Sequence, residues 1–237
     1  MTIPIPIIIF ALRKKKINQL KLYLYLKYSA SGHLKLTHET IEQITKELNW
    51  KSIKTFHANF NWLARKKWIS FNSISKNCRI AGYVQLKNRI DFFTSSGVEF
   101  NPEDFKQFRP YVYATAITWC MKYKNWKEKQ PGRKKGRPGK SCCHQWYELP
   151  NRYLAKVLRL DHSTISRYKT AAVKAGYLTV HKQYDDLELP ESLIYALRYS
   201  LPDEAHLFVV HNGKSFRQKS DLISSTIHLK RKRLHAP

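Results

Sequence analysis

The chain of 237 residues is long enough for one large domain or two small ones, and its 43% hydrophobic and 13% aromatic content can fill folded cores. Its formal net charge of +26, from 43 Lys and Arg against 17 Asp and Glu, exceeds what solubility requires. This composition excludes a disordered polyelectrolyte and predicts a polyanionic partner, either nucleic acid or an anionic membrane.

The apolar N-terminus is too short to span a membrane. Its uncharged run at residues 1–12 has about half the length that a bilayer requires. The basic cluster at residues 13–16 follows the apolar run, whereas a signal peptide places its positive charge first. We therefore expect residues 1–16 to form an arm that packs on the body of the protein or on a partner. The chain is expected to be cytoplasmic and DNA-associated, with no membrane partner.

The four cysteines, Cys78, Cys120, Cys142 and Cys143, include no C-x-x-C pair. The adjacent Cys142 and Cys143 are poorly placed for a shared zinc site or an ordinary disulfide. A metal bound by Cys142, Cys143 and His144 would need further ligands from distant parts of the chain. We expect reduced thiols, no metal and no cofactor.

The first half of the chain has the apolar spacing of three helices followed by a β-hairpin. Helices are predicted from Ile17, from Thr37 as an N-cap and from Ser52 as an N-cap. The residues expected to be buried along them are Leu20, Tyr23, Leu24, Tyr28, Ile41, Ile44, Leu48, Ile53, Phe56, Phe60 and Leu63. The alternation in WISFNSI and the segment RIAGYVQL predict a hairpin that turns near residues 75–77.

The second half repeats this order. Residues 111–123 predict a first helix, PNRYLAKVLRL a second, and DHSTISRYKTAAVKAGYLTV a third helix that leads into a strand. Asp161 is the expected N-cap of the third helix, and Gly176 is expected to adopt positive φ at its end. The residues expected to be buried are Tyr153, Leu154, Val157, Leu158, Ile165, Tyr168, Ala172 and Val173. The endings LARKKWISF and VKAGYLTV correspond at an offset of about 109 residues, which indicates two related domains.

Three helices followed by a hairpin, in this order, resemble the winged helix-turn-helix domains of DNA-binding proteins. The segment LAKVLRLDHSTISRYKTAAVKAGYL is similar to the helix, turn, recognition helix and first wing strand of bacterial regulators. The tandem arrangement resembles plasmid and phage replication initiators. The resemblance covers about two thirds of the chain and implies an α+β, mostly helical fold with two tandem winged helix-turn-helix domains.

The expected domains follow the chain in order. They are an N-terminal arm at 1–16, a first winged-helix domain at 17–94, a linker at 95–104, a second winged-helix domain at 105–184 with a basic inter-helix loop at 129–145, and a C-terminal extension at 185–237. The linker is predicted because TSSGVEFNPEDF is rich in small and acidic residues. The C-terminal extension is expected to serve as an outer wing, a dimerisation element or both.

The third helix of each half is expected to face DNA, because recognition helices enter the major groove with their N-terminal residues leading. The residues expected to read bases are Lys54, Thr55, His57, Asn61, Ser163, Thr164, Ser166 and Arg167. The residues expected to contact the DNA backbone are Lys51, Ser52, Arg65, Lys134, Lys135, Arg137, Lys140, Lys169, Lys174, Lys230 and Arg231. The alternative is an ordinary solvated helix face, but residues 51–67 and 162–183 contain no acid, whereas exposed faces usually mix signs.

The stretch KYKNWKEKQPGRKKGRPGK, residues 122–140, has nine Lys or Arg and one acid. Within it, KKGRPGK resembles an AT-hook, whose Gly-Arg-Pro core lies in the minor groove, although Lys135 stands where the AT-hook has Arg. The resemblance implies that Arg137 enters a narrow A-tract groove. The alternative is a flexible basic loop that contacts phosphates only.

Catalytic motifs are missing from the sequence. The fragment GKS at residues 139–141 lacks the earlier glycine of a phosphate-binding loop, because Lys134 occupies that position. No H-E-x-x-H or G-x-S-x-G motif occurs, and the acids at residues 185–191 are explained by helix caps and solvent. We therefore expect a protein that is not an enzyme.

These patterns predict a sequence-preferring double-stranded DNA-binding protein, acting as a transcriptional regulator of bacterial, plasmid or phage type. One alternative is a plasmid or phage replication initiator that binds origin repeats, and another is an architectural subunit of a larger nucleoprotein complex. Duplex DNA is the expected partner, with a second copy of the chain or replication and transcription proteins as further candidates. RNA is less expected, because its deep, narrow major groove does not admit a recognition helix.

Overall fold

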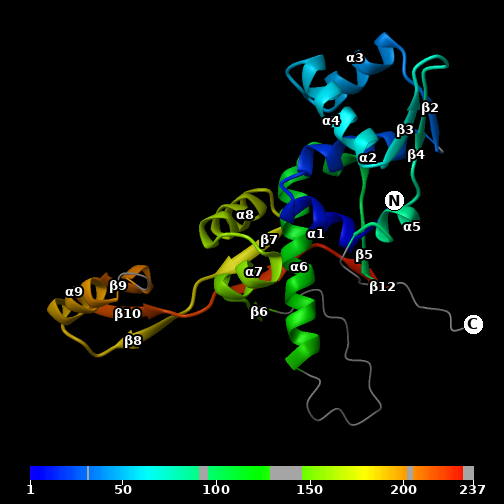
Figure 1. The fold of residues 1–237 in the computed structure, drawn as a ribbon. Coiled ribbons are helices and arrows are strands. Elements are labelled where there is room, and N and C mark those ends of the chain that lie inside the picture. The colour runs from blue at the N-terminus through cyan, green and yellow to red at the C-terminus, as the bar shows by residue number, and fades with distance from the viewer. Residues whose placement is uncertain (31, 91–95, 129–145, 202–204, 232–237) are drawn as a thin grey trace, which may run out of the picture.

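The computed structural model describes residues 1–30, 32–90, 96–128, 146–201 and 205–231, and the protein is an α+β fold that is about half helical (Figure 1). Within these residues it has nine α-helices and four small antiparallel sheets of three strands each. No helix in this part of the chain combines the length and the apolar content that crossing a bilayer requires.

The first half forms the three helices and the hairpin that its apolar spacing predicts. Its elements are α2 (Ile17–Ser29), β2 (His33–Lys35), α3 (His38–Glu47), α4 (Ile53–Arg65), β3 (Ile69–Asn72) and β4 (Asn77–Ile80). Helix α4 packs on α2 and buries Phe56, Phe60 and Leu63. The unpredicted strand β2 joins the hairpin, which gives the strand order β2-β4-β3. The last part of RIAGYVQL forms a short helix, α5 (Tyr83–Lys87), instead of continuing the second strand.

The second half contains the same sequence of elements. They are α6 (Phe108–Glu128), β6 (Tyr147–Glu148), α7 (Asn151–Leu158), α8 (His162–Lys174), β7 (Leu178–His181) and β11 (Leu222–Ser225). Helix α8 packs on α6 as α4 packs on α2, and it buries Ile165 and Ala172. The strand order β6-β11-β7 is the counterpart of β2-β4-β3.

Backbone details also recur between the halves. Helices α4 and α8 are each 13 residues long and begin 109 positions apart, at Ile53 and His162. After each helix the chain turns through positive φ, 57° at Lys67 and 77° at Gly176. A backbone N–H then donates back into the helix, from Trp68 to Leu63 O at 2.9 Å and from Tyr177 to Ala172 O at 3.0 Å. The local structure therefore supports a duplicated layout.

One predicted helix cap agrees with the structure, whereas two other caps and two predicted core residues differ from it. Thr37 caps α3 as predicted, because its Oγ1 accepts a hydrogen bond from the Thr40 N–H at 3.2 Å. Ser52 and Asp161 occupy N-cap positions, but their side chains accept no capping hydrogen bond. Tyr28 and Val173, expected in the core, are 52% and 38% exposed, since both lie in the last turn of their helices.

A segment inserted between β7 and β11 forms a separate lobe. It comprises β8 (Tyr184–Leu187), α9 (Glu191–Ser200), the 3₁₀ turn η2 (Ala205–Leu207), β9 (Phe208–His211) and β10 (Lys214–Gln218), with strand order β8-β10-β9. We call residues 184–218 the insertion lobe, and Figure 1 shows it projecting from the body. In the first half, β3 and β4 are joined by a short turn, so the lobe occupies the place of that turn in the second half.

The chain termini and the expected linker form one sheet. Strands β1 (Thr2–Pro4) and β12 (Leu229–Arg231) pair with opposite edges of β5 (Ser96–Glu99), and the 3₁₀ turn η1 (Pro102–Phe105) follows β5. The described part of the expected linker at 95–104, from residue 96 on, is therefore a central strand and a turn. The described residues of the expected C-terminal extension at 185–237 are divided among the insertion lobe, β11 and β12. Such pairing depends on distant segments and leaves little trace in local sequence.

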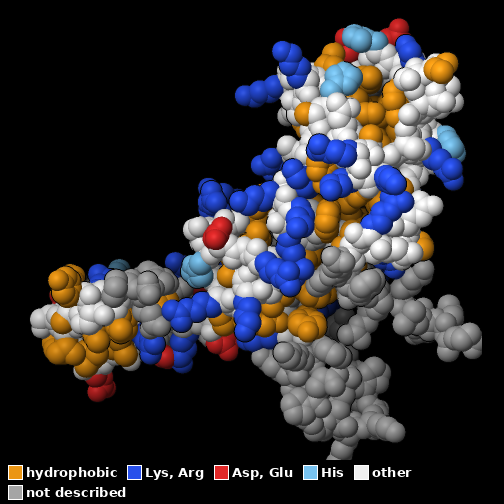
Figure 2. All heavy atoms as spheres, in the orientation of Figure 1, with side chains coloured by type: hydrophobic (Ala, Val, Ile, Leu, Met, Phe, Trp, Pro, Cys, Tyr) orange, Lys and Arg blue, Asp and Glu red, His pale blue; other side chains and the backbone are white. Residues whose placement is uncertain are grey.

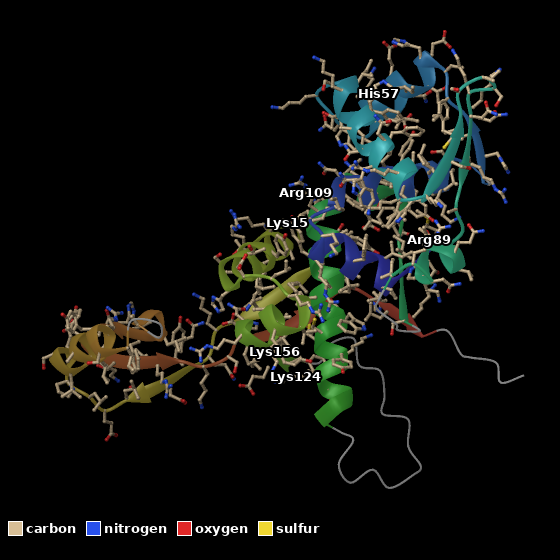
Figure 3. The ribbon with its side chains drawn as sticks, viewed as in Figure 1. Lys15, His57, Arg89, Arg109, Lys124 and Lys156 are labelled. Atoms are coloured by element: carbon tan, nitrogen blue, oxygen red, sulfur yellow. The ribbon has the colours of Figure 1, made fainter. Side chains whose placement is uncertain are left out.

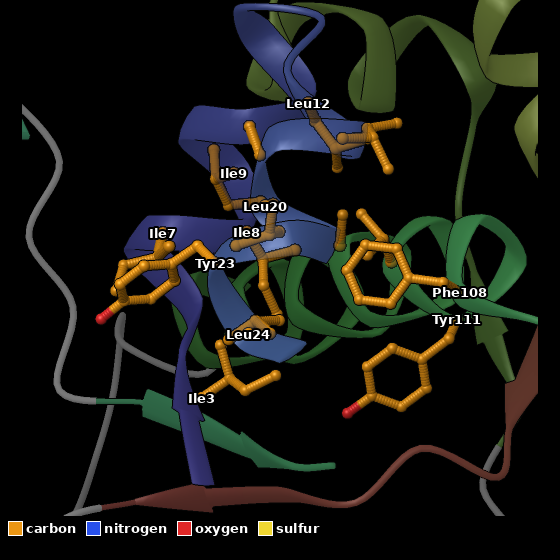
Figure 4. Close-up of a cluster of buried hydrophobic side chains, with 14 of the residues drawn as sticks. Ile3, Ile7, Ile8, Ile9, Leu12, Leu20, Tyr23, Leu24, Phe108 and Tyr111 are labelled. Carbon is orange, nitrogen blue, oxygen red and sulfur yellow. The ribbon is translucent and has the colours of Figure 1, made fainter. Parts of the chain in front are cut away.

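The expected N-terminal arm lies at the centre of the molecule. Helix α1 (Ile5–Arg13) packs against both α2 and α6, which belong to different halves. Its side chains Ile7, Ile8, Ile9 and Leu12 are fully buried, and Figure 4 shows them beside residues of α2 and α6 such as Leu20 and Phe108. The apolar run therefore packs on the body, and the two halves share one continuous hydrophobic core.

Candidate nucleic-acid interface

The outer side of α4 carries the residues expected to read DNA in the first half. Lys54, His57 and Asn61 are exposed, and Thr55 is half-buried with its Oγ1 lying 3.3 Å from Ser52 Oγ. The residues expected to contact the backbone here, Lys51, Ser52 and Arg65, are also exposed. Figure 3 shows His57 on the outside of this part of the molecule. The helix therefore presents a cationic and polar side that contains no acid.

The outer side of α8 carries the corresponding residues of the second half. Ser163, Ser166 and Arg167 are exposed on the first two turns of the helix, and Thr164 is half-buried. The Arg167 Nη2 donates a hydrogen bond to Thr164 Oγ1 at 3.2 Å. Lys174 is exposed at the C-terminal end of the helix. All four base-reading candidates of this half therefore lie near the N-terminal end of α8.

Lys169 was expected to contact the DNA backbone, but the structure places its side chain in the interior. It is 6% exposed, and its Nζ lies 2.5 Å from Asp221 Oδ2. The other carboxylate oxygen of Asp221 accepts a hydrogen bond from Gln218 Nε2 at 3.0 Å. Lys169 stands four residues after the buried Ile165, so it shares the inward side of the helix. Its charge is balanced inside the protein by an acid 52 positions further along the chain.

Lys230 and Arg231, two further residues expected to contact the DNA backbone, belong to strand β12. Lys230 Nζ lies 2.9 Å from Glu99 Oε2, and this hydrogen bond lowers the pKa of Glu99. Lys230 therefore pairs with an acid of the neighbouring strand β5, and its side chain stays about half exposed. The expected backbone contacts Lys134, Lys135, Arg137 and Lys140, the AT-hook resemblance, and Cys142 and Cys143 all lie outside the described residues.

A groove of about 1120 Å³ lies between the two halves. Four cationic side chains line it, Lys21 from α2, Lys106 and Arg109 from the start of the second half, and Lys174 from α8. Figure 3 shows Arg109 in the region between α4 and α8. Burial, followed by the nearby charge of Arg109, lowers the pKa of Lys21, whose Nζ donates to Leu48 O at 2.9 Å.

Sequence analysis missed this groove because its cations come from separate elements. Lys106 and Arg109 lie at the start of the expected second domain, before the first helix that the apolar spacing predicts at residues 111–123. The groove also contains one acid, Glu47, which accepts hydrogen bonds from Tyr25 OH at 2.5 Å and Gln43 Nε2 at 2.9 Å. These bonds lower the pKa of Glu47, while burial and the same contact raise the pKa of Tyr25 to about 12. Cations outnumber the acid in this groove.

A second hollow of about 800 Å³ lies at the N-terminal end of α8. Ser163 and Ser166 line it together with Lys182, Arg217 and Lys219 from the base of the insertion lobe. Its charge is mixed, because Lys219 Nζ lies 2.5 Å from Asp185 Oδ1 and Asp221 also contributes to the lining. The base of the lobe therefore flanks the leading end of α8.

Figure 2 shows Lys and Arg side chains gathered on the visible face of the body, from the region of α4 down past α8, with few acids between them. The visible face of the body is thus predominantly cationic.

Among the described residues, no group of three or more His, Cys, Asp or Glu side chains is arranged to hold a metal ion. Cys78 and Cys120 are buried free thiols, and burial raises the pKa of Cys78 to about 11.

Comparison of the chain with protein-family models, with curated proteins and with solved structures found no match. The recurrent strand order, the two acid-free helix faces and the cationic groove between the halves are the features from which a function is inferred below.

Proposed function

We propose that the chain binds duplex DNA with sequence preference through two winged helix-turn-helix units, using α4 and α8 as recognition helices. One observation carries the proposal: two copies of the same layout, with the same strand order, each expose an acid-free side on the same helix. A duplicated solvated helix would be expected to mix charges on that side.

Base reading is assigned to the leading turns of each helix, because helices of this motif enter the major groove with that end first. On α8, Arg167 has the geometry for a bidentate contact to guanine, and Ser163 and Ser166 can bond bases or phosphates. On α4, Lys54 and His57 occupy the corresponding turns, and Asn61, about one turn further along the helix, can pair with adenine.

Affinity is assigned mainly to phosphate contacts. The groove between the halves is lined by Lys106, Arg109 and, from the end of α8, Lys174, and the DNA backbone would pass there if both helices bound one duplex. Such contacts hold the protein in register on the duplex and make affinity depend on salt. Two recognition helices on one chain suit an asymmetric or directly repeated site.

Transcriptional regulation is the role we propose for this binding. A replication initiator and an architectural subunit would use the same surface but different sites in the genome. Selection of a random duplex pool at near-physiological salt, followed by sequencing of the bound fraction, tests the binding and separates these roles. A two-part motif is expected; its occurrence at promoters would indicate a regulator, and its repetition at an origin an initiator. Tight binding without any motif would contradict sequence preference and favour the architectural role.

Replacing Arg167 with Ala tests base reading directly. We expect the variant to lose about 1 to 3 kcal/mol of binding free energy on the selected site and to tolerate other bases at one position. The measurement is a titration of a panel of duplexes that differ at single base pairs. Lys174→Ala, at the far end of the same helix, is the matched control and should weaken all duplexes equally. An equal loss on every duplex for Arg167→Ala would show that this residue does not read a base.

A further inference from the structure

The insertion lobe differs in charge from the rest of the chain. Residues 184–218 contain three Lys or Arg and six Asp or Glu, a net charge of −3. The remainder holds 40 Lys and Arg against 11 acids, a net charge of +29. A lobe of this charge is unsuited to lie along phosphates, so its outer surface must serve something other than DNA contact.

The lobe also exposes an unusual share of apolar surface. Five of the twelve large hydrophobic side chains that are exposed in the described part of the chain belong to it: Tyr184, Leu193, Tyr195, Tyr199 and Leu201. Tyr199 is 91% exposed and Tyr195 is 54% exposed. Figure 2 shows hydrophobic side chains gathered on the visible surface of the lobe.

Only a narrow side of helix α9 packs against the rest of the lobe. Ile194 is fully buried, and the Arg198 guanidinium donates to Phe208 O, with Nε at 2.9 Å. The opposite side carries Ser192, Tyr195, Ala196 and Tyr199, all exposed and spaced as i, i+3, i+4 and i+7. This spacing places the four residues in one stripe along the helix. We call these four residues the α9 stripe.

The α9 stripe is complementary to itself. When two copies of α9 lie antiparallel about a two-fold axis between positions 195 and 196, Ala196 of one copy faces Ala196 of the other on one flank of the seam, and Tyr195 faces Tyr195 on the other flank. Tyr199 of one copy is then opposite Ser192 of the other. The Tyr199 ring thus meets a small side chain at the centre of the seam, and the small Ala196 side chains let the helices approach closely in an isologous contact. The helix itself is neutral, because Glu191 is balanced by Arg198.

We propose that the α9 stripe is the docking surface for a second copy of this chain, in an antiparallel helix pair. A second copy suits this surface because the α9 stripe carries no charge and because the lobe lets two copies meet without bringing the two cationic bodies together. A ten-residue helix is about 15 Å long, so the pair buries less than the roughly 1,200 Å² of a standard stable interface. The free protein is therefore a weak dimer, and two copies bound to adjacent DNA sites cooperate.

Disulfide trapping tests the pair without DNA. In a background with Cys142→Ser and Cys143→Ser, Ala196→Cys is expected to form a dimer disulfide under mild oxidation, because positions 195 and 196 flank the axis. Ser192→Cys, on the same stripe, is the matched control. Its two copies would lie seven positions apart along the helix, roughly 10 Å, and should not cross-link. Equal trapping at both positions, or none at position 196, would overturn the antiparallel pair.

A charge substitution then tests the interface itself. Tyr199→Glu should abolish trapping through Ala196→Cys and shift sedimentation at high concentration to the monomer. Leu193→Glu, exposed on the other side of α9, should leave both unchanged, and circular dichroism checks that each variant is folded. Trapping that survives Tyr199→Glu would overturn the proposal.

The consequence for cooperative DNA binding rests on the function proposed above, whereas trapping and sedimentation do not. A trapped dimer that binds no DNA would reject the DNA function alone. DNA binding by a protein that fails the trapping test would reject the α9 pair alone.

Discussion

Lys169 shows that a cation in an acid-free stretch of sequence can be buried in the folded protein. It belongs to an acid-free stretch of sequence, but its ammonium group is buried against the Asp221 carboxylate, which Gln218 also contacts. These contacts join α8 to the residues that precede β11, at the base of the insertion lobe. The pair therefore positions the proposed recognition helix relative to the lobe and does not bind DNA.

Removing one member of this pair should be costlier than removing both. Lys169→Met leaves the Asp221 carboxylate buried without its partner, and we expect a loss of about 3 kcal/mol in the free energy of unfolding. The double variant Lys169→Met, Asp221→Leu should recover a substantial part of that loss, because no unpaired charge remains. Urea unfolding measures the free energy of unfolding of the single variants and of the double variant. A double variant as unstable as the sum of the two single variants would show that the ion pair has no coupling energy.

At the scale of elements, helix α1 determines how the two halves are held together. Ile7, Ile8 and Ile9 are all fully buried, so the helix is covered on several sides and not only along one stripe. Its neighbours α2 and α6 come from different halves. The two units that resemble each other are consequently parts of one folded body, and the spacing between α4 and α8 depends on this helix.

Ile8→Ala should destabilise the whole body. The substitution removes buried methylene and methyl groups and leaves a cavity, for which we expect a cost of about 2 to 5 kcal/mol. Lys14→Ala, just after the helix and exposed, is the control and should change stability by less than about 0.5 kcal/mol. Denaturant unfolding followed by tryptophan fluorescence provides the measurement. A negligible effect of Ile8→Ala would mean that α1 is not part of the stable core.

At the scale of the molecule, charge is divided between a cationic body and an acidic lobe. The body carries the two proposed recognition helices and the groove between them, while the lobe carries the α9 stripe. Attraction of DNA and association of copies are thereby assigned to different regions. The proposed DNA contact uses residues of the body, and the proposed association of copies uses residues of the lobe.

The groove predicts how affinity should respond to salt. The triple variant Lys106→Ala, Arg109→Ala, Lys174→Ala should reduce the slope of log K against log salt concentration by roughly 0.9 for each phosphate contact that is lost. The preferred sequence should stay the same, because phosphate contacts carry no base information. Lys87→Ala, on α5 and away from the groove, is the control. An unchanged slope in the triple variant would place the DNA backbone elsewhere.

Local sequence predicted the parts of the fold that depend on neighbouring residues. The spacing of Phe56, Phe60 and Leu63 predicted α4, and Gly176 was correctly expected to adopt positive φ after α8. Both features arise within one or two turns of chain, so a single segment contains the necessary information. The acid-free stretches that mark α4 and α8 as candidate interfaces are likewise visible in the sequence alone.

Tertiary structure decided the features that join distant segments. The sheet in which β5 pairs with both chain termini replaced the expected linker, and β11 completed the second unit after an inserted lobe. The partner of Lys169 and the grouping of Lys106, Arg109 and Lys174 also depend on residues far apart in the chain. Strand pairing and burial of a charge are set by the partner as much as by the segment itself, so periodicity and composition predict the helices and their exposed faces but not these contacts.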